Sequence, residues 1–483
     1  MSKITPITAA ALAAGISYYG ITGPYRPLVL LALPLLCFLG TLAGGPPCAY
    51  PNRQAFRSFR LIRRYGMAAF AGWCLGLSAG TEKPLCLGLP DQAVAGLQGV
   101  LQDDPRNGHY GGGRGTLKLS GAAGLGGVRT SAQGVIPVDF REEALPRLRE
   151  FGRDCGLYLE GVIHSDGNVR RFRAYSAHIV KPPPRLEQIR SGIRGYILRR
   201  FTGPVWGGLA SALLLGVRDA LDTDLAKSYR DAGCSHVLAL SGMHLAVIAG
   251  LIAFLLKKPL GLKAAGVIGV VCVIGYAYLA GNLPSLHRAG IMYVLGTLAV
   301  LGSLPKPPLP LLAMTFLIQL CRDPESGRSV SFMLSYLSLL GILTIGDSIC
   351  DCLRGHLPSA LSRPLSASLG AFIATAPVSA LCFGILRPVG IIAGIIVVPL
   401  TTLFMICAIL FLAADWAAPF FVPFLEGFLS VIYAILERLI GLGALAPGVS
   451  AGPGLVLLCA VGSAGVCIFL PQYKKRRKFA PFD

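Results

Sequence analysis

The chain has 483 residues, a mean hydropathy of +0.63, 53% hydrophobic residues and only 14% charged residues. Soluble domains carry about 25% charged residues, so the composition excludes a soluble globular protein. The net charge of +20 does not by itself indicate nucleic-acid binding, because membrane proteins accumulate Lys and Arg in cytoplasmic loops. The composition predicts an integral membrane protein with several membrane-spanning helices.

Three apolar runs come first, near residues 4–21, 27–45 and 65–80, and a basic stretch separates the second from the third. Two closely spaced runs before a basic loop favour an uncleaved helical hairpin over a signal peptide. We therefore assign residues 1–82 to N-terminal transmembrane helices.

Residues 83–183 contain charges of both signs, many glycines and short runs of β character. Ser165–Asn168 is typical of a hairpin turn between two such runs. This segment predicts a small β-rich extracytoplasmic domain, for which an OB-like barrel is one interpretation and other small barrels remain open. Residues 184–204 then predict an amphipathic basic helix at the membrane surface. Its arginines include Arg190, Arg194, Arg199 and Arg200.

Apolar runs continue from there to near the end of the chain. We assign 205–413 to a transmembrane core, 414–470 to C-terminal transmembrane helices and 471–483 to a basic cytoplasmic tail. Individual spans are expected near 235–256, 264–281, 289–304, 307–321, 329–347, 365–385, 389–413, 419–441 and 452–470. The run 204–216 is too short to span and is expected to be re-entrant or buried. The fold class is thus an α-helical polytopic membrane protein with about twelve transmembrane helices and one β-rich domain.

The positions of the basic loops set the orientation. If the N-terminus lies inside, the loops at 257–263, 306 and 354–363 and the tail at 474–478 all fall inside as well. Cytoplasmic loops are enriched in Lys and Arg, so this agreement supports the assignment. The β-rich domain then falls on the outer side.

Polar residues inside spans need an explanation, and the densest group lies between Asp231 and His244. Gly233, His236, Ser241 and His244 fall within one arc of about 140° on a helix. Ser241 and the adjacent Gly242 can loosen the helix and expose backbone groups, as broken helices do at transport sites. A contact between helices is the competing interpretation. The two histidines lack a third ligand nearby, which argues against a metal site.

A second group, Pro284, Ser285 and Arg288, falls at the outer start of a span, where Arg288 can contact a phosphate or a lipid headgroup. The competing interpretation is a proline turn with an interfacial arginine. Ser335 belongs to a serine-rich helix face, for which small-residue packing is the default explanation. The sequence contains no Walker A loop, no GxSxG elbow and no HExxH motif, so it predicts neither an enzyme nor a cofactor.

The order of these residues resembles a known family. Ala232–His244 is similar to the signature A-G-x-x-H-x-L-A-x-S-G-x-H of the ComEC family, the channel proteins of bacterial DNA internalisation. The family pattern continues with Pro284–Ala289, which is similar to P-S-x-x-R-A, and with Asp323–Tyr336. The resemblance also includes Leu213–Asp219, Thr375–Pro377, Phe383–Gly384 and Val398–Leu400.

The sequence departs from the family pattern in three places. Met333 stands where Gln is usual and Gly394 where Asn is usual, so both positions lack a side-chain amide. Many members also carry a C-terminal metallo-β-lactamase-like domain, and this sequence resembles a short form without it.

The resemblance implies a multi-pass channel of the cytoplasmic (inner) membrane that passes single-stranded DNA into the cytoplasm during natural transformation. Its implied partners are single-stranded DNA, the lipid bilayer, an extracytoplasmic DNA receptor, cytoplasmic DNA-pulling or single-strand-binding proteins, and further copies of the chain. A polyanion needs a wet path lined by groups that bind phosphates weakly. The path residues implied by analogy are Arg218, His236, Ser241, Gly242, His244, Pro284, Ser285, Arg288 and Ser335.

Two other functions remain open at this point. One is a transporter of another polar substrate, and the other is a membrane nuclease that uses the outer domain, where Asp103–Asp104 and Glu142–Glu143 are paired acids. Cys86 and Cys155 flank that domain on the oxidising side, so a disulfide between them is a further prediction.

Overall fold

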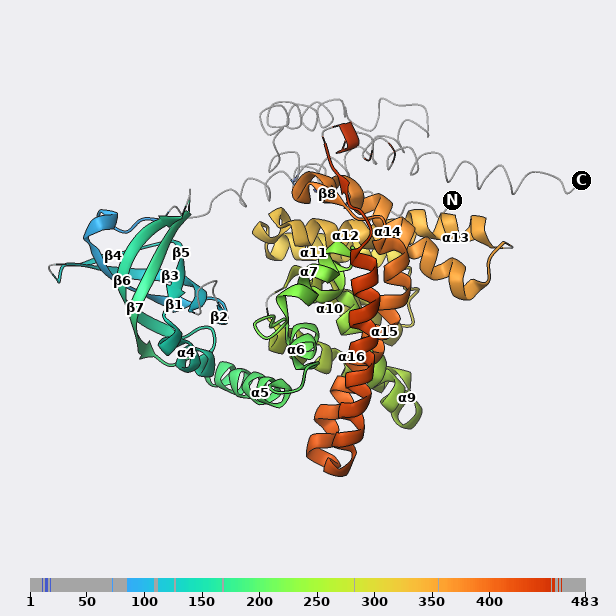
Figure 1. Ribbon diagram of the computed structural model, residues 1–483, viewed down its shortest axis with the longest axis horizontal. Helices are drawn as coiled ribbons and strands as arrows, with labels where there is room; N and C mark the ends of the chain where they lie inside the picture. Colours follow the sequence, from blue (N-terminus) through green and yellow to red (C-terminus); the bar gives the residue numbers. More distant parts are fainter. Residues whose placement is uncertain are drawn as a thin grey trace, which may run out of the picture. The chain divides into compact units, whose positions relative to one another are not determined.

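The computed structural model describes residues 85–452 except 108–111, 126, 167–168, 282 and 355, and a few isolated residues beyond both ends. It divides into two compact units (Figure 1). The barrel unit comprises Glu82–Leu221 and Leu412–Ala417, and the helical unit comprises the remainder. The predicted N-terminal helices of residues 1–82, most of the span 452–470 and the tail 471–483 lie outside the described residues.

Five strands close into a barrel. They are β1 (Val94–Leu101), β3 (Gly113–Gly124), β5 (Val135–Phe140), β6 (Gly156–Asp166) and β7 (Val169–Lys181), paired in the ring β1-β3-β5-β7-β6-β1. Only β5 and β7 pair in parallel, and α4 (Leu145–Phe151) lies between the third and fourth of these strands. A five-stranded Greek-key barrel with this helix is the OB arrangement. The predicted OB-like domain is therefore confirmed.

Alternating side chains fill the barrel. Leu97, Leu117, Ile136, Leu157 and Phe172 have no exposed surface, and their neighbours along each strand point outward. The register shifts at Gln98/Gly99 and at Glu160/Gly161, and such bulges bend strands around a closed barrel. Both bulges need glycine: a Cβ at Gly161 would lie 2.0 Å from the Arg173 carbonyl oxygen, and one at Gly99 would lie 2.3 Å from that of Lys118.

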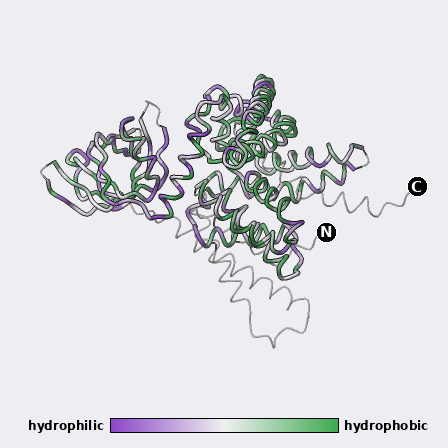
Figure 2. Tube along the Cα trace, turned by 90° about the horizontal axis from the view of Figure 1, so that it is seen from below, coloured by the Kyte–Doolittle hydropathy of each residue, from purple (hydrophilic) through white to green (hydrophobic). Residues whose placement is uncertain are grey.

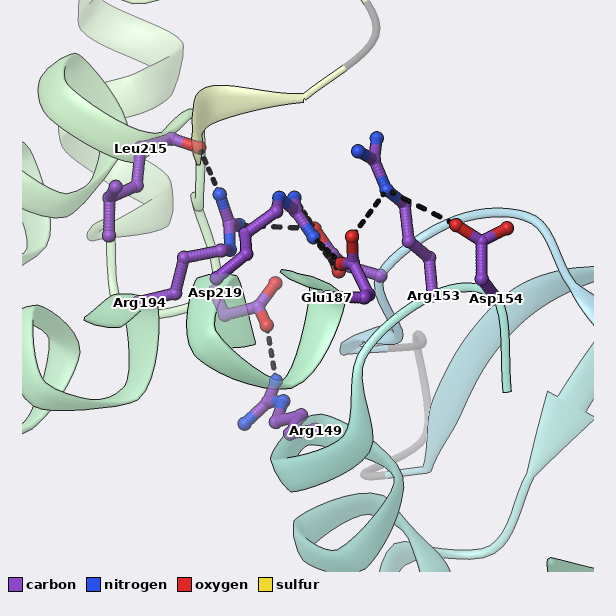
Figure 3. A network of polar contacts seen from close by, with 9 residues as sticks. Arg149, Arg153, Asp154, Glu187, Arg194, Leu215 and Asp219 are labelled. Atoms are coloured by element: carbon purple, nitrogen blue, oxygen red, sulfur yellow. Dashed lines mark hydrogen bonds and ion pairs between the residues drawn. The ribbon is translucent and has the colours of Figure 1, made fainter. Parts of the chain in front are cut away.

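Helix α5 (Arg185–Phe201) presents its charged face to the barrel and to α6 (Gly207–Leu215). Arg190, which is 2% exposed, binds Glu187 and places Nη2 2.6 Å from Asp104 Oδ2. Arg194 Nη1 donates to the Leu215 carbonyl at 3.4 Å, and Arg153 Nε lies 3.2 Å from Glu187 (Figure 3). These contacts fasten the barrel to α5 and α6.

The outward face of α5 is aliphatic. Leu186, Ile189 and Ile193 are 70%, 60% and 46% exposed, while Arg190 and Arg194 are buried. The helix forms close to its predicted bounds, but two of its five arginines, Arg190 and Arg194, are buried against the protein instead of facing the surrounding medium. Helix α6 is buried along its whole length, as expected for a run too short to span.

The C-terminal end of α5 is bonded to the last turn of α15 (Gly390–Ala417). Tyr196 donates to Asp415 Oδ2 at 2.7 Å, and Arg200 pairs with the same carboxylate. The predicted alternation of spans puts α5 outside and residues 414–418 inside. The contact puts both on one side, so one of these two side assignments is wrong.

Five helices in the described part of the chain are long and apolar enough to cross a membrane. The longest, α9 (Gly242–Ala280), breaks at Gly261, whose φ is +79°. Its two halves pack on each other, because Leu245 and Ala249 share one cluster with Val273 and Ala280. Each half is long enough for a bilayer at 1.5 Å per residue, so α9 is a hairpin that corresponds to the predicted spans 235–256 and 264–281.

The other candidate spans lie close to the predicted ones. One runs from Val330 to Leu353 and comprises α12 (Val330–Gly341), the π-helical turn η5 (Ile342–Gly346) and α13 (Asp347–Leu353). The remaining three are α14 (Ser359–Phe383), α15, and α16 (Val422–Ala444) with the short η6 (Pro419–Phe421) before it. In Figure 2 the hydrophobic colour prevails over the helical part of the chain. The predicted total of about twelve spans remains a prediction.

Shorter elements complete the helical unit. They are α7 (Thr223–Asp231), α8 (Ser235–Leu238), α10 (Pro284–Leu301), α11 (Pro308–Arg322), η4 (Glu325–Arg328) and the strand pair β8 (Ile385–Leu386) and β9 (Val449–Ser450). Helices α12 and α14 cross at glycines, since a Cβ at Gly341 would lie 2.3 Å from the Gly370 carbonyl oxygen. Small residues allow membrane helices to approach this closely.

Candidate functional site

The helix breaks at Ala239–Ser241, between α8 and α9. Ser241 is extended, and its Oγ accepts from the Met243 backbone at 3.3 Å. His244 Nδ1 accepts from the Ser241 backbone at 3.1 Å, so the two side chains cap the start of α9 reciprocally. The spacing of Ser241 and His244 thus allows the two side chains to cap the first turn of α9.

The earlier part of the signature holds helices together. Gly233 has φ +72°, and a Cβ there would lie 2.9 Å from both the Arg387 carbonyl oxygen and the Gly390 Cα. Arg387 Nη2 also donates to Asp231 Oδ1 at 2.9 Å. Position 233 therefore requires glycine for two reasons: its backbone is left-handed, and a side chain would collide with the segment 387–390. His236, on α8, is exposed, whereas His244 has no exposed surface.

The start of α10 is joined to this break. Ser285 Oγ donates to the Leu240 carbonyl at 2.7 Å, directly before the Ser241 cap. Pro284 is the first residue of α10, a position where the missing N–H of proline costs no helix hydrogen bond. Its carbonyl accepts a hydrogen bond from Gln319 Nε2 at 3.0 Å. These bonds fix the two helix starts relative to each other.

Arg288 lies one turn further along α10 and is only 8% exposed. Its Nη1 donates to the Ser335 carbonyl at 2.6 Å, and its guanidinium carbon lies 5.8 Å from the centre of the Tyr336 ring. Gly242 faces the guanidinium, because a Cβ there would lie 3.1 Å from Nη2. Among the described residues no carboxylate lies within 4 Å of Arg288, and its Nε has no hydrogen-bond partner.

A buried guanidinium without a counter-ion is costly, and such groups in membrane proteins mark pathways and binding sites. Here one carbonyl and one aromatic face compensate the charge in part. An anionic oxygen placed beside Gly242 would compensate it further. The break at Ser241–Gly242 and the buried side chain of Arg288 together form the candidate site.

The structure adds two residues that the sequence did not single out. Tyr336 donates to Gln319 Oε1 at 2.8 Å, and its ring packs on Phe332 and Phe316. The amide of Gln319 thus joins Pro284 of α10 to Tyr336 of α12. Gln319 is 3% exposed and interrupts an apolar run, which is the signal that was available in the sequence. Ser335 contributes its carbonyl to the site, while the Oγ of Ser338 donates to that carbonyl at 3.1 Å.

A cavity of about 110 Å³ lies at the start of α10 and the C-terminal end of α11. It is lined by His287, Ile291, Gln319, Arg322 and Asp323. Gln319 thus lines this cavity and also accepts the hydrogen bond from Tyr336. Over the described ranges, no group of three or more His, Cys, Asp or Glu side chains is arranged to hold a metal ion.

The family model described as "Competence protein" matches residues 213–475, which is more than half of the chain. The chain belongs to the competence protein family. This match includes the break at Ser241, the start of α10 and Arg288. Family membership supports a role in DNA uptake in competence and a multi-pass membrane protein.

Two relatives are similar to parts of the chain. An uncharacterized protein of Aquifex aeolicus is 28% identical over 261 residues, which cover 52% of this chain and 60% of that protein. ComE operon protein 3 of Bacillus subtilis is 26% identical over 141 residues, which cover 28% of this chain and 18% of that protein. The chain therefore spans less than two thirds of either relative. No solved structure matches it.

Arg218 is exposed and belongs to the barrel unit of this competence-family protein, in the segment after α6. The neighbouring Asp219 pairs with Arg149 of α4, so this segment is bonded to the barrel unit.

The barrel carries mixed charges. Asp139 on β5 lies 3.2 Å from Arg114, 3.5 Å from Arg171 and 3.6 Å from His164, so one carboxylate pairs with two arginines and lies beside a histidine. The guanidinium carbon of Arg141 lies 5.3 Å from the centre of the Tyr175 ring, so the face of this exposed aromatic side chain is already covered by a cation.

Cys86 and Cys155 are both free thiols in the structure. Cys86 is exposed, whereas Cys155 is fully buried and lies 3.6 Å from the Lys181 carbonyl oxygen. Burial raises the pKa of the Cys155 thiol to about 11, which makes it a poor nucleophile for disulfide formation. The disulfide remains a prediction.

Proposed function

We propose that the chain is a membrane channel that passes single-stranded DNA into the cytoplasm during natural transformation. The observation that carries the proposal is Arg288: a buried cation without a carboxylate partner among the described residues, facing a glycine at a break between two helices. A phosphate oxygen fits a guanidinium of this kind. One isolated cation binds each phosphate weakly enough for the strand to move on.

The remaining path candidates have different parts in this proposal. Ser241 and His244 hold the helix start open beside Gly242, and Ser285 fixes α10 against it. Pro284 and Ser335 supply backbone carbonyls that position Gln319 and Arg288. His236 is exposed and is proposed as a contact at the approach to the break. Arg218 is proposed as a contact on the barrel side.

The barrel unit is proposed to act outside the membrane, where α5 supports it at the lipid surface through Leu186, Ile189 and Ile193. An extracytoplasmic receptor would deliver DNA, and a cytoplasmic pulling or single-strand-binding protein would draw the strand inward. Assembly with further copies of the chain belongs to the same proposal.

A nuclease in the barrel is less well supported. Asp104 is engaged by Arg190 and Arg194, so its carboxylate is not free to act as a base. A transporter of another polar substrate would also use a buried arginine, and only the family membership favours DNA over such a substrate.

The test is DNA uptake in the host. End-labelled duplex is supplied, and nuclease-protected single-stranded label is counted in the cytoplasm of a deletion strain complemented with wild type, Arg288→Gln or Arg363→Gln. Arg363 is an exposed arginine at the start of α14 and serves as the matched control. We expect label with wild type and Arg363→Gln, and about tenfold less or none with Arg288→Gln, at equal amounts of protein in the membrane.

Normal uptake in the deletion strain would overturn the channel proposal. Normal uptake with Arg288→Gln would remove Arg288 from the path and leave the channel without its supporting observation.

A further inference from the structure

The cavity at the start of α10 and the C-terminal end of α11 has room for more than water. Its volume is about 110 Å³, whereas one water needs about 10–15 Å³ and a benzene ring fits a cavity of about 150 Å³. Two of its lining residues, Arg322 and Asp323, are exposed, while Gln319 is only 3% exposed. The cavity therefore extends from exposed side chains to a buried amide, and a small planar group that stays partly exposed fits its volume.

Several donors in this cavity are unengaged. Arg322 carries five N–H donors and makes no hydrogen bond or ion pair with any residue that the structure describes. The imidazole of His287 also lacks a side-chain partner in that part of the chain, and its two ring nitrogens can donate and accept. Gln319 donates one amide proton to the Pro284 carbonyl, which leaves its second amide proton for a ligand.

The cavity also contains a carboxylate. Asp323 Oδ1 accepts from the Ser326 backbone at 3.3 Å, and Oδ2 has no partner within the described ranges. A phosphate in the cavity would be repelled by Asp323, and a simple cation would be repelled by Arg322. This combination of side chains therefore suits a neutral ligand with both donors and acceptors along one edge.

A nucleobase is a neutral ring with such an edge. Arg pairs with guanine, Gln pairs with adenine, and Asp accepts from the amino group of cytosine. A guanidinium plane can also stack on a base that has left its own stack. Ile291 adds an apolar contact for the ring. The five lining residues thus supply each kind of contact that a single base uses.

The cavity is joined to the buried cation of the candidate site. His287 and Arg288 are successive residues of α10. Gln319 accepts from Tyr336, whose ring centre lies 5.8 Å from the guanidinium carbon of Arg288. A nucleotide carries a phosphate and a base, so a buried cation and a neighbouring polar cavity suit its two parts.

We propose that this cavity holds a nucleobase of the single strand. Arg322 and Gln319 donate to acceptors of the base, and Asp323 accepts from its amino group. This inference deepens the proposed function, on which it rests for the identity of the strand.

The test compares two strands of equal length and charge on the purified full chain in detergent. One is a fluorescently labelled oligodeoxycytidine, the other is an abasic phosphodiester with the same label, and anisotropy gives the Kd of each at one salt concentration. We expect the wild type to bind the strand with bases about tenfold more tightly, which is the size of one good contact to a base.

Variants locate this preference. Arg322→Gln and Asp323→Asn should each reduce the ratio of the two Kd values to about threefold or less, because each removes one contact to the base. Both positions are exposed, so the variants keep the fold. Glu325→Gln is the matched control, since Glu325 is an exposed acid of η4 outside the cavity lining, and it should retain the wild-type ratio.

Three results would overturn the inference. Equal binding of both strands by the wild type would mean that no base is held. An unchanged ratio in both variants would place the base contact elsewhere in the chain, and an equal loss for both strands in Arg322→Gln would assign the cavity to phosphate. The binding assay involves no transport, so its failure leaves the uptake experiment standing, and a failed uptake experiment leaves the measured base contact standing.

Discussion

The guanidinium of Arg288 lies over the ring of Tyr336, with 5.8 Å between the guanidinium carbon and the ring centre. The phenol hydroxyl of the same ring is held by Gln319 at 2.8 Å. One aromatic side chain thus supports the buried cation on its face and fixes two helices through its edge. Cation–π contacts of desolvated arginines contribute up to about 2 kcal/mol, which offsets part of the cost of burying this charge.

Substitutions at Tyr336 should separate these two effects. Tyr336→Phe keeps the ring but leaves the buried Gln319 oxygen without its donor, so we expect a loss of about 1–2 kcal/mol in unfolding free energy and near-normal uptake. Tyr336→Leu also removes the ring, and uptake should then fall about tenfold at equal protein level. The measurements are thermal unfolding of purified protein and uptake of labelled DNA. Equal uptake for the two variants would mean that the ring does not support Arg288.

Gly242→Ala tests the space beside the guanidinium. The added Cβ would lie 3.1 Å from Arg288 Nη2 and 3.2 Å from the Ala289 Cβ, so the guanidinium has to move. Overpacking typically costs about 1–3 kcal/mol, and we expect uptake to fall about tenfold. Gly250→Ala is the control on the same helix, because a Cβ there meets nothing within 4 Å. A similar loss of uptake in both variants would show a general effect on α9.

The two histidines of the signature should behave differently. His244 is buried and accepts the Ser241 backbone donor, so His244→Ala removes part of the α9 cap and should cost about 1 kcal/mol of stability. His236 is exposed, so His236→Ala should change the unfolding free energy by less than about 0.5 kcal/mol. Reduced uptake with His236→Ala at unchanged stability would indicate contact with the strand. Normal uptake would leave His236 outside the path.

The predicted spans followed from the lengths of apolar runs, which the bilayer thickness dictates, and α12 to α16 form close to their predicted bounds. The OB-like barrel followed from alternating short strands and a turn signal. Its strand order did not, because the parallel pairing of β5 with β7 depends on contacts distant in the sequence. The aliphatic outer face of α5 could not be predicted from the sequence either. Arg190 is turned inward by two carboxylates, Glu187 in the same helix and Asp104, which is distant in the sequence.

Within the candidate site, the sequence identified several of the residues but not the contacts that they make. The sequence singled out Ser241 and His244 as one polar face, but only the structure shows them bonded to each other at a helix start. Arg288 stood out as a charge near a span. Its buried position, its missing carboxylate partner and the supporting pair Gln319–Tyr336 depend on the packing of α10, α11 and α12.

The ion network between the barrel and α5 gives a prediction about pH. Burial disfavours the charged form of Asp104, but the hydrogen bond from Arg190 and the charges of Arg194, Arg190 and Arg153 outweigh it, so the pKa of Asp104 lies below its usual value. A lowered pKa in the folded state means that the stabilisation is present above the unfolded pKa of about 3.9. It is lost as the pH falls through the folded pKa.

Asp104→Asn should therefore destabilise the barrel unit by roughly 3 kcal/mol at pH 7, because Arg190 loses a carboxylate partner in a buried position. Thermal unfolding of the full chain, followed at pH 7 and near pH 3, should show a difference from wild type that shrinks in acid as the wild-type carboxyl takes up its proton. The neighbouring Asp103 is exposed, so Asp103→Asn should leave the unfolding temperature unchanged. A difference that persists in acid would show that Asp104 stabilises the barrel through its shape and not through its charge.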